Sequence, residues 1–180
     1  MNSGISYTSL PEAMGQFVIG QRRSYVMTGT HGKTTTTAML AWVAEQLGLK
    51  PGFLIGGIPG NFPRSFQVPG GQVFIIEGDE YDTAYFDKVP KFVHYRPCCV
   101  LLTSLEFDHA DIYSDLAQIQ GEFRKLLRLI PAEGRLVYYA EEPNIAAILD
   151  SQSHGDCVSY GWNQGDWQVR EVSEIGRAHV

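Results

Sequence analysis

Apolar and polar positions follow two different periods along the chain, and together they predict strands that alternate with helices. Short apolar runs bounded by polar turns predict strands at residues 25–27, 52–58, 72–77, 98–102, 136–139 and 157–160. The stretch 167–172 alternates between apolar and polar residues, as an edge strand does.

Helices are predicted where apolar residues recur at spacings of three and four. One such helix follows Lys33, ends at Gly48 before Pro51, and has a face that carries Thr36, Met39, Leu40, Val43 and Leu47. Another runs from a cap at Ser114 to Pro131, with a face formed by Leu116, Ile119, Phe123, Leu126, Leu127 and Ile130. Shorter helices are predicted from the Ser9 cap to about Val18 and at 145–149.

This alternation predicts an α/β fold, in which a mostly parallel sheet is flanked by helices on both faces. Ligands of such sheets bind at the carboxyl ends of the strands. Three polar motifs, which begin at Thr28, Glu77 and Thr103, directly follow or close predicted strands. We therefore expect these three motifs to meet at one edge of the sheet.

The first motif, V-M-T-G-T-H-G-K-T-T-T-T at residues 26–37, has the order strand, phosphate loop, helix. Gly29 and Gly32 allow the backbone to approach a polyphosphate, and the helix N-terminus supplies N–H groups and partial positive charge. Lys33 can reach the terminal phosphates, and the Thr34 hydroxyl can bind Mg²⁺. The common pattern has a glycine where this chain has Met27, so the loop is the shortened G-x-x-G-K-T form. The alternative is a chance G-K-T in an ordinary loop.

Composition excludes several classes of protein and partner. The 180 residues are enough for one well-buried domain, and a net charge of −6 argues against nucleic acid or an anionic membrane as a partner. No apolar run approaches the ~20 residues needed to cross a bilayer. Cys98 and Cys99 are adjacent and Cys157 is isolated, which fits neither a disulfide framework nor a zinc site. This cysteine usage favours a reducing cytoplasm.

Acidic residues cluster after two of the predicted strands. Glu77 ends the strand 72–77, where a carboxylate suits Mg²⁺, and Glu80 and Asp82 follow it. The alternative for this segment is a solvated acidic turn. The run 105–111 brings together Glu106, Asp108, His109 and Asp111, in which an imidazole could bind a second divalent ion or form a surface hydrogen bond.

The remaining histidines carry weaker expectations. His31 lies inside the phosphate loop and is expected to shape the turn rather than to bind phosphate, and His94 is expected to be packed or at a rim. The sequence contains no Ser-His-Asp or Cys-His nucleophile pattern.

The motifs T-G-T-H-G-K-T-T, E-G-D-E-Y-D and L-E-F-D-H-A-D-I-Y, taken together, resemble the central ATP-binding domain of the Mur ligase family. Members of this family make peptide-type bonds in peptidoglycan precursors. The runs P-G-F-L-I-G-G-I-P-G-N-F and F-D-K-V-P-K-F-V-H-Y are most similar to the member that joins the tripeptide L-alanyl-γ-D-glutamyl-meso-diaminopimelate to UDP-N-acetylmuramate. The resemblance extends from about Tyr7 to Trp167.

The resemblance implies an acyl-phosphate mechanism with ATP and Mg²⁺. ATP would phosphorylate the lactoyl carboxylate of UDP-N-acetylmuramate, and the tripeptide amine would displace phosphate. ATP would be bound by Gly29, Thr30, His31, Gly32, Lys33, Thr34 and Thr35. Lys33 would stabilise the migrating phosphoryl group, Thr34 and Glu77 would hold one Mg²⁺, and His109 a second. Gly56, Gly57 and Asn61 would lie near the muramate.

The chain also departs from the family pattern. It has Thr103-Ser104 where the family usually has Thr-Asn, and serine lacks the paired donors and acceptor of the amide. We expect residues 1–23 to be a linker and short helix from an absent N-terminal domain, and 24–173 to be an incomplete central domain. Residues 174–180 back-translate to a sequencing adapter and are expected to be a non-native tail.

Two other functions share parts of this pattern. The family member that adds L-alanine to the same UDP-sugar has the phosphate loop and the D-H element as well. A nucleotide-binding module that acts as a switch would need only the loop. A ligase releases ADP only when both UDP-N-acetylmuramate and an amine are present, whereas a switch protein hydrolyses ATP without them.

Overall fold

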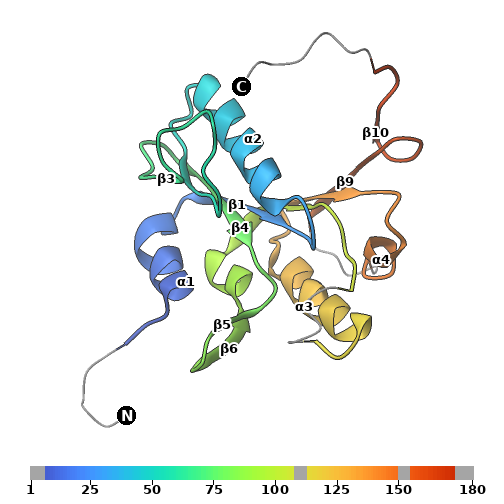
Figure 1. Ribbon diagram of the computed structural model, residues 1–180, viewed down its shortest axis with the longest axis horizontal. Coiled ribbons are helices and arrows are strands. Elements are labelled where there is room, and N and C mark those ends of the chain that lie inside the picture. The colour runs from blue at the N-terminus through green and yellow to red at the C-terminus, as the bar shows by residue number, and fades with distance from the viewer. Residues whose placement is uncertain (1–6, 108–112, 150–154, 173–180) are drawn as a thin grey trace.

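The strand that precedes the phosphate loop lies in the middle of the sheet. The computed structural model describes residues 7–107, 113–149 and 155–172, and in this part of the chain the main sheet has eight strands. Their order is β10-β9-β8-β7-β1-β4-β2-β3, and all neighbours are parallel except the pair β2 and β3. The mostly parallel α/β sheet expected from the sequence is thus confirmed (Figure 1).

The strand bounds follow the apolar runs closely. The eight strands of the sheet are β1 (Arg23–Thr28), β2 (Gly52–Leu54), β3 (Phe66–Gln67), β4 (Val73–Gly78), β7 (Pro97–Leu102), β8 (Arg135–Tyr139), β9 (Asp156–Gly161) and β10 (Trp167–Gln168). A separate antiparallel pair is formed by β5 (Asp82–Ala84) and β6 (Asp87–Pro90).

Helices lie on both faces of the sheet (Figure 1). One face is covered by α2 (Lys33–Gln46). The other packs against α1 (Leu10–Ala13), the π-helix η1 (Met14–Ile19), the 3₁₀-helix η2 (Lys91–Tyr95), α3 (Leu116–Leu129) and α4 (Pro143–Ala146). Ser9 caps α1 by accepting a hydrogen bond from the Glu12 N–H, as predicted. The cap of α3 is Asp115 rather than Ser114, because the Asp115 carboxylate accepts from the Gln118 N–H.

The two faces of the sheet carry cores of very different size. On the α3 side, Val26, Ile76 and Val100 belong to a large cluster that includes Phe92 and Phe123. On the α2 side the buried cluster is smaller: the helix contributes Ala41 and Ala44, which pack against Phe53, Ile55 and Ile75. Small side chains let α2 approach the sheet closely.

The apolar face predicted for α2 is wrong for most of its large residues, although Leu40 does pack against the core. Met39, Val43 and Leu47 are 65%, 52% and 70% exposed, whereas Thr37, Ala41 and Ala44 are buried. Beside this exposed stripe, a shallow depression of about 620 Å³ over β7, β8 and β9 is lined by Met39, Leu40, Val43, Leu101, Val137 and Val158, among others.

Other differences from the sequence expectations are local. The β5–β6 hairpin was not predicted, and the helix expected at 145–149 begins two residues earlier, at Pro143. β2 stops at Leu54, and β10 has only two residues. Within the described residues, no helix is long and apolar enough to cross a membrane.

Candidate active site

The loop between β1 and α2 takes the shape expected for binding phosphate. Gly29 and Gly32 have φ angles of 127° and 81°, which an L side chain rarely adopts. A Cβ on Gly29 would lie 2.4 Å from Thr103 Oγ1 and 2.8 Å from Ser104 N. Gly32 is the N-cap of α2, so the first turn of this helix begins at Lys33 and points its N–H groups toward the loop.

Residues that follow β7 support the loop from the side. The Thr103 hydroxyl donates to the carbonyl oxygen of His31, and the Ser104 carbonyl accepts from the Thr30 N–H at 3.1 Å. The Ser104 hydroxyl accepts from the His31 N–H at 2.9 Å and lies 3.1 Å from Thr30 Oγ1. Ser104, at the position where the resemblance predicted asparagine, thus contacts the loop directly.

The Lys33 ammonium lies against the loop. Its Nζ donates to the Gly29 carbonyl at 2.6 Å and lies 3.4 Å from Glu80 Oε2. The side chain is 11% exposed, so the charge is close to the phosphate-binding N–H groups and largely shielded from water. This is the position that the sequence predicted for a cation acting on terminal phosphates.

Thr34 and Glu77 are brought together by the adjacent strands β1 and β4. The Thr34 hydroxyl donates to Glu77 Oε2 at 2.9 Å, and the other carboxylate oxygen accepts from the Gly56 N–H. Two adjacent ligands of an octahedral Mg²⁺ bound at about 2.0–2.1 Å lie roughly 2.9 Å apart, so these two oxygens fit a shared cation. Among the described residues, no three His, Cys, Asp or Glu side chains form a metal-sized cluster. Such a cation would take its remaining ligands from phosphates and water.

The alternative for the acidic segment after Glu77 was a solvated turn, and only some of its acidic residues are exposed to solvent. Asp82 pairs with Lys88 on the surface, and Asp79 pairs with Lys91, each at 2.8 Å. Glu80, in contrast, has no exposed side-chain surface and faces Lys33. Its carbonyl oxygen accepts from the hydroxyl of Tyr113, whose pKa is raised by burial. No sequence pattern distinguishes Glu80 from its acidic neighbours.

The histidine expectations have different outcomes. The His31 side chain is largely exposed and lies 3.7 Å from Glu106, while its backbone makes the loop contacts. His94 is mostly buried and pairs with Asp87 at 2.8 Å. His109, the predicted ligand of a second Mg²⁺, lies outside the described residues, as do Asp108, Asp111 and the tail 174–180.

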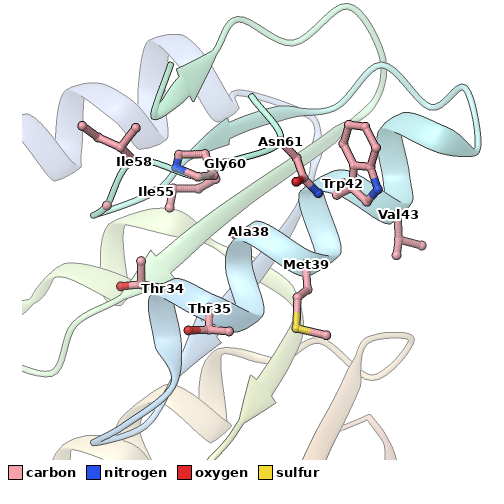
Figure 2. A pocket seen from close by; sticks show the side chains of 12 residues that line it. Thr34, Thr35, Ala38, Met39, Trp42, Val43, Ile55, Ile58, Gly60 and Asn61 are labelled. Atoms are coloured by element: carbon pink, nitrogen blue, oxygen red, sulfur yellow. The ribbon is translucent and has the colours of Figure 1, made fainter. Parts of the chain in front are cut away.

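The three residues predicted to face the muramate divide between two cavities. Gly57 and Asn61 line a cavity of about 440 Å³ between α2 and the loop after β2, together with Thr34, Thr35, Trp42 and Ile58 (Figure 2). Gly56 lines a second cavity of about 270 Å³, with Glu77, Asp79 and Lys91 on its wall. The two cavities adjoin, because Thr34 lines the first, Glu77 lines the second, and the Thr34 hydroxyl donates to the Glu77 carboxylate.

A phosphate loop at the end of a central parallel strand, with a carboxylate at the end of the next strand, defines a nucleotide-binding site of the P-loop type. The family comparison is more specific. Residues 27–179 match the Mur ligase middle domain, and the chain belongs to the Mur ligase family.

Individual relatives are similar over most of this chain. The UDP-N-acetylmuramate–L-alanyl-γ-D-glutamyl-meso-2,6-diaminoheptandioate ligase of Escherichia coli is 43% identical over 96% of the chain. A crystal structure of the corresponding Neisseria meningitides ligase superimposes with a TM-score of 0.88 at 44% identity, covering 96% of this chain and 56% of that one. A UDP-N-acetylmuramate–L-alanine ligase of Clostridium botulinum is 33% identical over 88% of the chain and 33% of its own length. The present chain spans 38% of the length of the Escherichia coli relative.

Proposed function

We propose that this chain is the ATP-binding part of a ligase that joins L-alanyl-γ-D-glutamyl-meso-diaminopimelate to UDP-N-acetylmuramate and forms ADP. The observation that carries the proposal is the arrangement of Lys33, Thr34 and Glu77 at the ends of β1 and β4, in a chain 43% identical to a ligase of that name. The reaction belongs in the reducing cytoplasm, where the free cysteines would persist.

Each of these residues would have a separate role in phosphoryl transfer. The loop N–H groups of residues 29–35 bind the phosphates, and Lys33 neutralises charge on the phosphoryl group as it moves to the lactoyl carboxylate. Thr34 and Glu77 would hold Mg²⁺, which supplies further charge neutralisation when bound. The tripeptide amine then attacks the acyl phosphate carbon, the C–O bond to phosphate breaks, and the amine loses a proton as the amide forms.

The substrate positions are part of the same proposal. The cavity beside Gly57 and Asn61 is also lined by Thr34, and its position beside the loop supports a substrate that must reach the γ-phosphate. The wall at Gly56 adjoins Glu77 on the other side. We assign this region to the muramate, whose carboxylate must reach the γ-phosphate, and we retain His109 as a ligand of a second Mg²⁺.

The L-alanine ligase is the second candidate, because it shares the phosphate loop and acts on the same UDP-sugar. The lower identity of that relative, 33% against 43%, favours the tripeptide as the amine. A switch-type nucleotide-binding module is the third, and it predicts ATP hydrolysis without either substrate.

The test uses the full-length protein with ATP, Mg²⁺ and UDP-N-acetylmuramate, and measures ADP release with the tripeptide, with L-alanine or with no amine. We expect ADP release with the tripeptide only. Release with L-alanine only would assign the chain to the second candidate, and release without an amine would contradict ligation.

The same assay tests Lys33. Lys33→Ala should lower kcat by well over tenfold, because a cation acting on the transferring group in a shielded site is worth several kcal/mol. Lys125→Ala, which removes an exposed lysine of α3 paired with Glu122, is the control and should leave kcat unchanged. If Lys33→Ala keeps more than about a tenth of kcat, a loss below ~1.4 kcal/mol, the assigned role is wrong.

A further inference from the structure

The ion pair between Lys33 and Glu80 is unusual because both of its members are shielded from water. The side chains are 11% and 0% exposed, and Lys33 Nζ lies 3.4 Å from Glu80 Oε2. A buried carboxylate is costly unless a cation or hydrogen-bond donors compensate its charge. Removing the cation from such a pair is therefore much more harmful than removing the whole pair.

Glu80 is itself held in place. It follows β4 by two residues, and its carbonyl oxygen accepts from the buried hydroxyl of Tyr113. Its acidic neighbours Asp79 and Asp82 are instead paired with Lys91 and Lys88. Glu80 thus presents its carboxylate to the Lys33 ammonium, which also donates to the Gly29 carbonyl at 2.6 Å.

We propose that Glu80 is a positioning residue for Lys33: its buried carboxylate holds the ammonium at the loop before nucleotide binds and limits its movement afterwards. The catalytic consequence rests on the proposed function. An ammonium held in place need not move when charge develops on the phosphoryl group. A mobile ammonium would instead take the position that best suits the phosphates of bound ATP, and would have to move during the reaction. Glu80 should therefore matter more for kcat than for the binding of ATP.

The first experiment does not depend on the reaction. Thermal unfolding of the full-length protein is measured for Lys33→Ala, Glu80→Gln and the double variant. Lys33→Ala should lower Tm by several degrees, because it leaves the Glu80 charge buried without this partner. The double variant should recover at least half of that loss. Additive losses in the double variant would overturn the pairing.

The second experiment separates positioning from a merely structural role. Glu80→Gln keeps the size of the side chain and removes its charge, and it should lower kcat by about 100-fold while the KM for ATP changes less than threefold, as expected for a displaced catalytic group. Asp82→Asn makes the same chemical change two residues away, at an exposed pair, and is the matched control. Equal effects of the two substitutions, or a loss confined to KM, would overturn the proposal. If the unsubstituted protein does not ligate, the proposed function fails, and the unfolding cycle still decides whether Glu80 holds Lys33.

Discussion

At the scale of single residues, the phosphate loop depends on contacts from a distant part of the chain. The Ser104 hydroxyl accepts a hydrogen bond from the His31 N–H across 73 positions of sequence, and the Thr103 hydroxyl donates to the His31 carbonyl. The sequence showed that serine replaces the expected asparagine, but a tertiary contact of this kind leaves no local pattern. Short side chains at 103 and 104 also leave the space in which Gly29 fits.

Gly29 should be the glycine of this loop that is least tolerant of a side chain. Gly29→Ala combines a φ of 127° with a Cβ placed 2.4 Å from Thr103 Oγ1, so we expect ATP binding to be lost. The control is Gly48→Ala, where φ is 72° but nothing lies within 4 Å of the added Cβ. This control should cost only about 1–2 kcal/mol of backbone strain and leave binding intact. Isothermal titration with ATP and Mg²⁺ compares the two variants, and equal affinities would show that the loop can shift away from Thr103.

The proximity of Thr34 and Glu77, and the place of Lys33 at the loop, could be predicted from sequence because each residue is fixed by its position relative to a strand end. The burial of Glu80 could not, because an acidic turn has the same composition whether it is solvated or covered. Its shielding depends on tertiary neighbours such as Tyr113, 33 positions further along the chain. A local pattern therefore predicts which residues are available to a site but not how deeply each is buried.

At the scale of elements, helix α2 shows where hydrophobic periodicity misleads. The spacing of large apolar residues marked the face of Met39 and Val43, but the helix packs on the sheet through Thr37, Ala41 and Ala44. A closely packed helix selects small residues, which a hydrophobicity pattern scores weakly. In α3 the large residues do pack, and there the predicted face was confirmed by the burial of Ile119, Phe123, Leu126 and Leu127.

Hydrophobicity alone suggests that a polar substitution at Met39 destabilises the protein more than an apolar one at Ala41. The observed packing predicts the reverse. Ala41→Leu adds volume to a fully buried position beside Phe53 and Ile75, and should lower the free energy of unfolding by about 1–3 kcal/mol. Met39→Gln, on the exposed stripe, should change it by less than about 0.5 kcal/mol. Leu and Gln are both good helix formers, so the comparison isolates packing. Urea denaturation of the 180-residue chain measures both, and a larger loss for Met39→Gln would contradict the observed packing.

Strands were predicted where apolar runs were long, as in β4 and β7, and missed where pairing alone defines the element. The hairpin of β5 and β6 joins polar segments such as Asp82–Ala84, whose residues have low intrinsic strand preference. Its order comes from cross-strand hydrogen bonds and neighbouring ion pairs, including Lys88 with Asp82. Hydrophobic periodicity detects buried faces, and few residues of this hairpin are buried.

At the scale of the whole molecule, the site occupies one edge of a sheet that carries a shallow depression over β7, β8 and β9. The loop donors and Lys33 come from one short stretch of chain, so the 180-residue chain should bind ATP by itself. Ligation also needs the carboxylate, the γ-phosphate and the amine aligned away from water, an alignment worth roughly 7–11 kcal/mol. We expect the 180-residue chain to leave this alignment incomplete.

The expected result is ATP binding without ligation. Residues 1–180 are incubated with ATP, Mg²⁺, UDP-N-acetylmuramate and tripeptide, and the product is sought by mass spectrometry beside the full-length protein as a positive control. Clear formation of the UDP-muramoyl tripeptide by residues 1–180 would show that these residues suffice for catalysis.

The central place of β1 sets an order of events during synthesis on the ribosome. β1 pairs with β4 on one side and with β7 on the other, so its second neighbour is complete only when Leu102 has been made. The 74 residues between Thr28 and Leu102 take about 4–15 s to synthesise at roughly 5–20 residues per second. For that time the nascent chain carries the G-K-T motif without Thr103 and Ser104, which support the loop. The loop can therefore gain this support only late, after its central strand has both neighbours.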